Sequence, residues 1–190
     1  RSMSVDSNHP SEKAAKKQMQ VFRGADAKDL GMDEMPMIGI DEAMMASMGE
    51  QMVARQAGLV CEETSVLYRE PSGTGINLMR AWFKSGYIVP RHSHSSDCLY
   101  YVVAGEARFG TQVLRPGDGL FIPADDAYTL EAGPDGVEFL EFRTQQNFNM
   151  VFKNNDPVHL ERMAEAFNAN KANWPGEPRP SSARCGGKAA

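Results

Sequence analysis

Short apolar runs separated by turn residues dominate the second half of the chain. Runs rich in Val, Tyr, Phe and Leu occupy residues 64–69, 76–84, 99–103, 107–109, 119–122, 128–131 and 137–142. Clusters of Gly, Pro and Asp stand between them, for example at residues 116–118 and 133–136. Evenly spaced strands with turn signals between them are typical of a sandwich or barrel. The pattern therefore predicts an all-β domain over residues 59–150.

Two segments outside this domain have the periodicity of amphipathic helices. Asp41 is a favourable N-cap for a helix at about residues 41–57, and Asp156 followed by Pro157 is one for a second helix. Methionines recur at helical spacing in the first helix at Met45, Met48 and Met52. The apolar stripe of the second helix consists of Leu160, Met163, Ala164 and Phe167. A methionine stripe either lines an apolar ligand pocket or packs against a sheet or a partner subunit, and we expect packing.

Composition divides the remaining chain into a flexible N-terminal arm (1–18), an N-terminal extension (19–58), the C-terminal helix (151–173) and a disordered tail (174–190). In the extension, residues 19–22 are expected to form an edge strand.

Charge and apolar content exclude several classes of protein. The formal net charge of −5 and the single small basic cluster, Lys13, Lys16 and Lys17, argue against a nucleic-acid binder. No apolar run reaches the roughly 18–20 residues of a membrane span, and the chain has no secretory signal pattern. We therefore expect a cytoplasmic protein without a membrane partner. The three cysteines lie far apart, which argues against a disulfide framework and an all-thiolate zinc site.

A pair of histidines carries the most specific chemical signal. His92 and His94 stand two residues apart on extended chain, so their side chains leave the same face. Two adjacent imidazoles form half of a metal site. The alternative is that both are exposed polar residues before a Ser-Ser-Asp turn.

The residues around this pair resemble the first motif of a single-domain cupin. Gly86, His92, His94 and Gly105 occupy the motif's positions, and residues 116–124 resemble the first half of the second motif. The resemblance covers about residues 65–145. It implies a small antiparallel β-barrel, the cupin jelly roll or double-stranded β-helix, with flanking N- and C-terminal helices and a metal or ligand site in its mouth.

Two positions depart from the cupin pattern. Cys98 stands in the slot of the usual glutamate ligand, and Tyr128 in that of the last histidine. The resemblance implies His92 and His94 as ligands of a divalent metal, either Fe, Zn, Ni or Cu. Cys98 is either a thiolate ligand or a buried apolar group. Tyr128 is a ligand, an acid or base, or a hydrogen-bonded cap of the pocket.

Strand parity suggests further members of the site. Tyr100 shares a face with Cys98 and is either a catalytic base or a core tyrosine. Asp97 could replace the usual carboxylate ligand if the Ser95-Ser96 turn changes the strand alternation, so that its side chain faces the same side as the histidines. Arg80 is a carboxylate clamp if it points inward.

Three further residues are expected to lie outside the site. Glu138 and Glu141 are expected on the surface, and His159 in the C-terminal helix is expected to take no part in the site.

Two functions are compatible with these residues. The first is a metalloenzyme of the dioxygenase, isomerase or lyase class that acts on a small organic molecule, with oxygenase-like chemistry favoured. The second is a non-catalytic sensor or carrier with a structural metal or none. Because the apolar stripes of both helices need burial, we also expect a homodimer.

Overall fold

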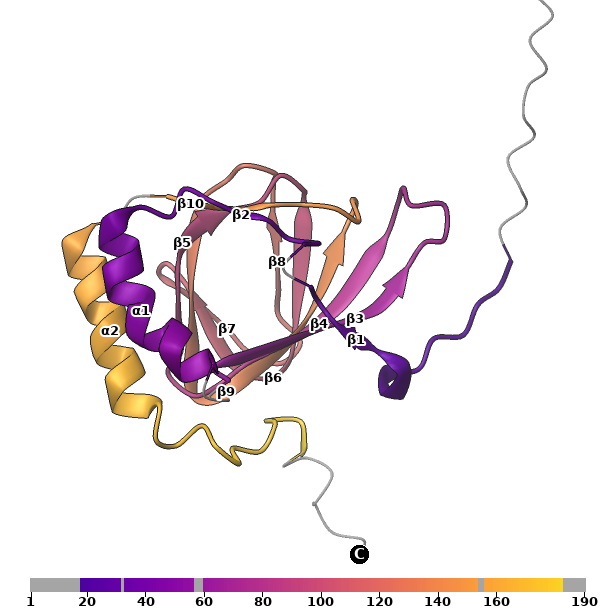
Figure 1. Ribbon diagram of the computed structural model, residues 1–190. Coiled ribbons are helices and arrows are strands. Elements are labelled where there is room, and N and C mark those ends of the chain that lie inside the picture. Colours follow the sequence, from indigo (N-terminus) through magenta and orange to yellow (C-terminus); the bar gives the residue numbers. More distant parts are fainter. Residues whose placement is uncertain (1–17, 32, 57–59, 154–155, 183–190) are drawn as a thin grey trace, which may run out of the picture.

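The computed structural model describes residues 18–31, 33–56, 60–153 and 156–182 and confirms the all-β class with flanking helices (Figure 1). In chain order, the elements are η1 (Gly24–Asp26), β1 (Lys28–Asp29), β2 (Met37–Ile38), α1 (Glu42–Gln56), β3 (Glu62–Arg69), β4 (Asn77–Phe83), β5 (Ile88–Ser93), β6 (Cys98–Phe109), β7 (Gln112–Leu114), β8 (Gly119–Ile122), β9 (Tyr128–Arg143), β10 (Met150–Phe152) and α2 (Pro157–Asn170). No helix in the described part is long and apolar enough to cross a membrane.

The long strand β9 organises the sheet. Its first residues pair with β5, its last residues pair with β4, and β6 runs antiparallel along most of its length. The path through the sheet is β1-β3-β4-β9-β5-β10-β2, with β7 and β8 attached to β6. Among the described strands, only the pairing of β10 with β2 is parallel. The sheet curls into a barrel, with β9 paired to β4, β5 and β6 (Figure 1).

Strand β6 replaces two strands predicted separately at 99–103 and 107–109. A bulge joins them, with register shifts on both sides of Gly105. Gly105 has a φ of +73°, and a Cβ there would overlap the carbonyl oxygen of Gly136. Only glycine combines this backbone angle with so close an approach, which explains the motif glycine. The runs 128–131 and 137–142 are likewise joined, as β9.

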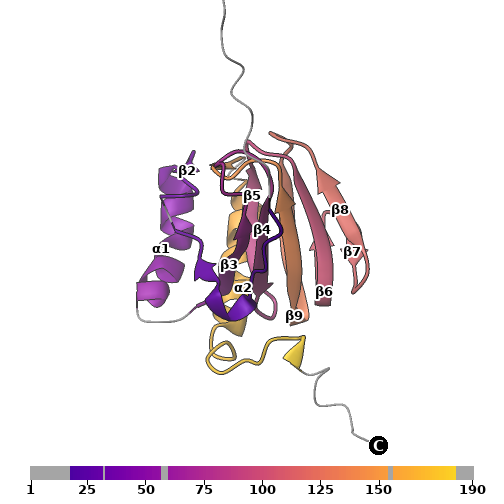
Figure 2. The same cartoon turned by 90° about the vertical axis from the view of Figure 1, so that its right-hand side faces the viewer.

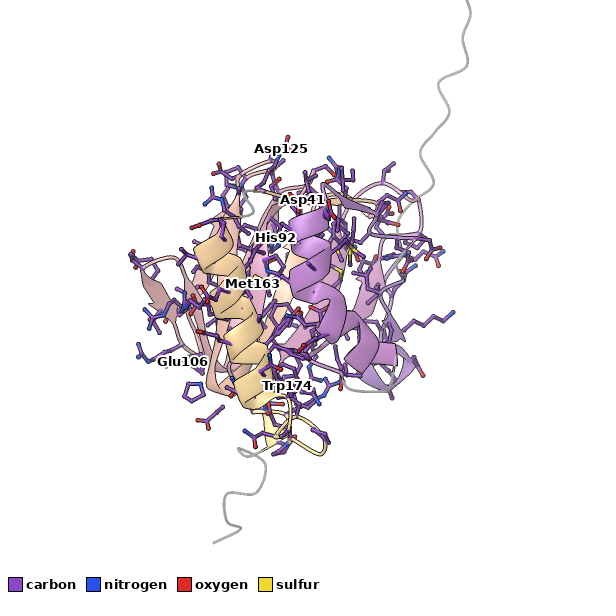
Figure 3. All side chains as sticks on the ribbon, turned by 60° about the vertical axis from the view of Figure 1, so that its left-hand side comes forward. Asp41, His92, Glu106, Asp125, Met163 and Trp174 are labelled. Carbon is purple, nitrogen blue, oxygen red and sulfur yellow. The ribbon has the colours of Figure 1, made fainter. Side chains whose placement is uncertain are left out.

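Both helices lie on one side of the barrel and begin at the predicted caps (Figures 1 and 3). The Met44 N–H donates to Asp41 Oδ1 over 2.9 Å, and the Val158 N–H donates to Asp156 Oδ1 over 3.1 Å. In α2 the stripe residues Leu160, Met163 and Phe167 are buried in the common core. This stripe is covered within the chain, so it gives no reason to expect a partner subunit.

The segment after α2 differs from the expected disordered tail. Trp174 is fully buried, and its indole N–H donates to the Ser85 carbonyl over 2.9 Å. Figure 3 places this side chain beyond the C-terminal end of α2. Farther along, Arg179 pairs with Glu63 over 2.6 Å. Residues 174–182 therefore form a strap across the outside of the barrel, whereas 183–190 lie outside the described residues.

The N-terminal side differs from expectation in one respect. Residues 19–22 form no strand, and Met19 and Val21 are exposed. The short strand β1 pairs with β3 instead. The arm 1–17 and Gly58 lie outside the described residues.

Candidate functional site

The barrel encloses a cavity of about 420 Å³ between β5, β6, β9 and the N-terminal extension. Six polar side chains from the strands around the cavity line it together: His92, His94, Tyr100, Tyr128, Glu141 and Arg143. The carboxylates of Asp29, Glu62 and Glu63 also border it. The cavity therefore unites the predicted histidines and tyrosines with charged residues that were not predicted there.

The histidine pair lies at the end of β5 with its two rings 4.8 Å apart between centroids. His92 Nδ1 lies 2.7 Å from the Pro90 carbonyl oxygen, and His94 Nδ1 lies 2.6 Å from that of Asn149. A carbonyl oxygen only accepts, so each Nδ1 carries the proton and donates. The tautomer left by these bonds has a free lone pair on Nε2, the atom that can bind a metal.

Burial keeps both imidazoles neutral. Chiefly through burial, and also through the nearby Arg143, the pKa of His92 is lowered to about 4. Burial, Arg143 and His92 together lower the pKa of His94 to about 2. At neutral pH both imidazoles are therefore uncharged, with the proton on Nδ1 and none on Nε2, as metal ligation requires.

Two tyrosines continue the polar wall. Tyr128 on β9 lies opposite His92 in register, with 4.4 Å between ring centroids. Its hydroxyl oxygen is 2.6 Å from that of Tyr100 on β6. Burial raises the pKa of both phenols, so both are protonated at neutral pH. The arrangement suits hydrogen-bond donation by these tyrosines.

Cys98 lies in the barrel wall and does not line the cavity. Burial, and then the charge of Glu141, raise the pKa of the thiol to about 12. It is therefore a neutral, buried group beside Tyr100. Among the described residues no group of three or more His, Cys, Asp and Glu side chains has the geometry of a metal site.

Glu141 and Arg143 are the residues that sequence reasoning missed. Glu141, expected on the surface, is buried in the cavity wall and lies 2.9 Å from Arg143. Although burial opposes it, the Glu141 carboxylate raises the pKa of Arg143. Both continue the series of inward-facing residues begun by Val137 and Phe139, at every second position of β9. This period of two was the signal in the sequence that could have placed them in the cavity wall.

Four other candidates lie outside the cavity wall. Glu138 is buried on the opposite face of β9, where it accepts from Arg80 over 2.6 Å, so the expected surface position was wrong. Arg80 therefore points away from the cavity and is not the inward-pointing carboxylate clamp considered above. Asp97 accepts from the Ala124 N–H over 2.8 Å and anchors the loop after β8. His159 lies on α2 and does not line the cavity.

Comparison with known proteins found no matching family model and no curated protein similar in sequence. Among solved structures, an RmlC-like cupin from Shewanella frigidimarina is 20% identical, with 45% of this chain and 77% of that chain covered and a TM-score of 0.41. KdgF from Halomonas sp. is 21% identical, with 45% and 82% covered and a TM-score of 0.39. A mutant of salicylate 1,2-dioxygenase from Pseudoaminobacter salicylatoxidans in complex with gentisate is 14% identical, with 52% and 31% covered and a TM-score of 0.42.

The strand pairing and the predicted motif positions describe the same architecture. The histidine pair lies at the end of β5, the motif glycine forms the bulge of β6, and the second motif runs into β8. By these features the barrel of this chain has the cupin fold.

Proposed function

We propose that this chain is a metal-dependent enzyme that acts on a small organic molecule, with His92 and His94 as metal ligands. The observation that carries the proposal is the hydrogen bonding of the two rings. Each Nδ1 is held by a carbonyl, so each neutral ring has only Nε2 left to bind a metal. Imidazole ligands suit iron, zinc, nickel and copper.

Tyr128 is the third functional group at the site. As a phenol it donates a hydrogen bond or a proton to a substrate oxygen, and as a phenolate it would be a third metal ligand. Tyr100, hydrogen-bonded to it over 2.6 Å, holds its hydroxyl in place and is the second proton carrier. Cys98 is a less suitable ligand because its protonated thiol lies outside the cavity lining.

The reaction belongs to the dioxygenase, isomerase or lyase class, of which we favour oxygenase-like chemistry. A metal held by the histidines supplies Lewis-acid or oxygen-activating chemistry to a substrate in the cavity. Tyr100 is 3% exposed and its hydroxyl lies 2.6 Å from that of Tyr128, so a proton would pass between the substrate and this pair of phenols.

The second candidate is a carrier or sensor that binds a small molecule without converting it. The apolar part of the cavity favours this alternative, because a 420 Å³ cavity is large enough for a small ligand. Such a protein would retain a small molecule when purified free of metal.

Metal content measured by plasma mass spectrometry tests the proposal. Tag-free wild-type protein, reconstituted under reducing conditions, is expected to hold nearly one metal ion per chain. The double variant His92→Ala/His94→Ala is expected to hold none, whereas the control His159→Ala, which removes a histidine outside the cavity, is expected to match the wild type. Wild-type protein without metal above background would overturn the proposal.

We also propose that the chain forms a homodimer through the outer face of β6, β8 and β9. Four exposed apolar side chains form this outer patch: Leu99, Tyr101, Phe121 and Phe142. Leu99 lies opposite both phenylalanines in register, so the patch is continuous across three strands. The helices cover the other side of the barrel (Figure 2). A second copy offers the same apolar surface in a self-complementary form.

A further inference from the structure

The cavity lining has a polar and an apolar part. Strands β5, β6 and β9 carry the histidines and tyrosines of the polar part. Six side chains of the apolar part are Met35, Met37, Met48, Met150, Phe152 and Leu130. The first three belong to the N-terminal extension, and Met37 lies on β2, next to Met150 in the sheet. We call these three residues the methionine wall.

The methionine wall suits an apolar body of variable shape. Met35, Met37 and Met48 pack against the buried core and also border the cavity. Methionine side chains are unbranched and polarisable, so they adapt to irregular apolar groups and make favourable sulfur contacts with aromatic rings. A ligand that reaches this wall therefore gains most from an aromatic or similar apolar part.

The charges of the lining disfavour an anionic group on the apolar body of a ligand. Four carboxylates border the cavity: Asp29, Glu62, Glu63 and Glu141. Among the described lining residues Arg143 is the single Lys or Arg, and it pairs with Glu141 over 2.9 Å, while Glu63 pairs with Arg179 of the strap over 2.6 Å. A carboxylate on the apolar body would therefore meet no lining cation without a carboxylate partner, and it would share the cavity with Asp29 and Glu62.

From this lining we infer that the site takes an amphiphile with an oxygen-bearing head group at the histidines and an aromatic or other apolar body, itself neutral or cationic, on the methionine wall. The inference rests on the proposed function, because the metal held by His92 and His94 would bind the head group. It adds the substrate class and three specificity-determining residues.

Three hydroxamic acids with the same metal-binding head group test the inference on metal-loaded protein by isothermal calorimetry. Benzohydroxamic acid adds a phenyl ring to the head group of acetohydroxamic acid, and 4-carboxybenzohydroxamic acid adds a carboxylate to that ring. We expect benzohydroxamic acid to bind at least tenfold tighter than acetohydroxamic acid and at least tenfold tighter than its carboxylate analogue. Equal affinities, or tightest binding of the carboxylate, would overturn the inference.

Variants of the methionine wall locate the preference. Met48→Gln and Met35→Gln are each expected to reduce the affinity for benzohydroxamic acid at least threefold and to leave metal content and acetohydroxamic acid binding unchanged. The matched control is Met45→Gln, on α1 like Met48. The Met45 side chain is 45% exposed and does not border the cavity. If only the control Met45→Gln lost affinity for benzohydroxamic acid, the inference would be overturned. Wild-type protein that holds no metal would instead overturn the proposed function.

Discussion

Two backbone carbonyls prepare the histidine pair for its role. His92 donates to the Pro90 carbonyl within its own strand, and His94 donates to that of Asn149 just before β10. Both bonds fix the tautomer and the orientation of the ring, as the hydrogen-bond partners of metal-bound histidines do in other proteins. A substitution that shifts the Asn149 backbone would therefore disturb His94 without touching the cavity.

The lowered pKa values of the histidines predict how stability depends on pH. In an unfolded chain both histidines titrate near pH 6.5, whereas in the folded chain the pKa is about 4 for His92 and about 2 for His94. Below pH 6.5 the unfolded chain binds more protons, so the free energy of unfolding falls as the pH falls. The stability contributed by the neutral rings is complete above pH 6.5 and decreases towards pH 4.

Urea unfolding of metal-free protein at pH 7 and pH 5 measures this effect. Between pH 7 and pH 5, we expect the free energy of unfolding to fall more in the wild type than in the variant His92→Gln/His94→Gln. The difference is expected to be about 1.4 kcal/mol per pH unit below pH 6.5 for each histidine. An equal loss in the two proteins would contradict neutral, buried histidines.

The buried ion pair of Glu141 and Arg143 gives a second prediction at this scale. Arg143→Met leaves the Glu141 charge unpaired in the barrel wall and is expected to lower the free energy of unfolding by about 3–5 kcal/mol. The double variant Glu141→Gln/Arg143→Met removes both charges and is expected to be more stable than Arg143→Met alone. Chemical denaturation of the two variants measures the difference. A double variant no more stable than Arg143→Met alone would contradict this dependence.

Among the elements, those with a strong local signal were predicted well. The strand at 119–122, the caps at Asp41 and Asp156, and the inward histidines all follow from periodicity and turn chemistry. Alternation along β9 places Glu141 and Arg143 on the same face as the buried Val137 and Phe139, but the charge of Glu141 favoured a surface position, and no prediction was made for Arg143. The ion pair that makes their burial possible joins residues 141 and 143, and no apolar pattern reveals it.

The strap after α2 could not be predicted, because its composition is that of a disordered tail. Its order comes from tertiary contacts with segments nearly 90 residues earlier. Glu177 accepts from the hydroxyl of Ser85 over 2.6 Å, and Lys84 donates to the Trp174 carbonyl over 2.9 Å. The same strap covers Glu138, with the Ser181 N–H donating to its carboxylate, and so explains why that residue is buried.

Removing the indole at the centre of the strap tests this account. Trp174→Ala is expected to lower the free energy of unfolding by about 3–5 kcal/mol, because it removes a fully buried aromatic side chain and its hydrogen bond to Ser85. Val158→Ala, at a position 71% exposed on α2, is the control and is expected to change stability by less than about 0.5 kcal/mol. Thermal and urea unfolding compare the two. A Trp174→Ala variant as stable as the control would mean that the strap does not hold the barrel.

For the whole molecule, the cavity is a joint product of the barrel and the extension. The barrel supplies the histidines and tyrosines, and α1 with the segment before it supplies the methionine wall. The local sequence predicted the barrel and the helix of the extension but not the contact between them. A helical pattern does not specify which face of a barrel the helix covers. Within the methionine stripe, Met48 packs against the core and borders the cavity, whereas Met45 is 45% exposed, so the expected packing was wrong for Met45.

The outer patch predicts the assembly state. Light scattering coupled to size exclusion is expected to give the mass of a dimer for the wild type at micromolar concentration. Phe121→Arg places a charge at the most exposed position of the patch and is expected to give a monomer. Val158→Arg on α2, outside the patch, is expected to remain dimeric. A monomeric wild type, or a dimeric Phe121→Arg variant, would contradict this interface.

The central claim is that the imidazoles of His92 and His94 bind one metal ion together. Electron paramagnetic resonance of the Cu(II)-loaded protein measures this most directly, because nitrogen couplings count the imidazoles bound to the copper. The account predicts two coupled nitrogens in the wild type, one in His92→Ala and two in His159→Ala. A wild-type spectrum without nitrogen coupling, or one that is unchanged in His92→Ala, would contradict it.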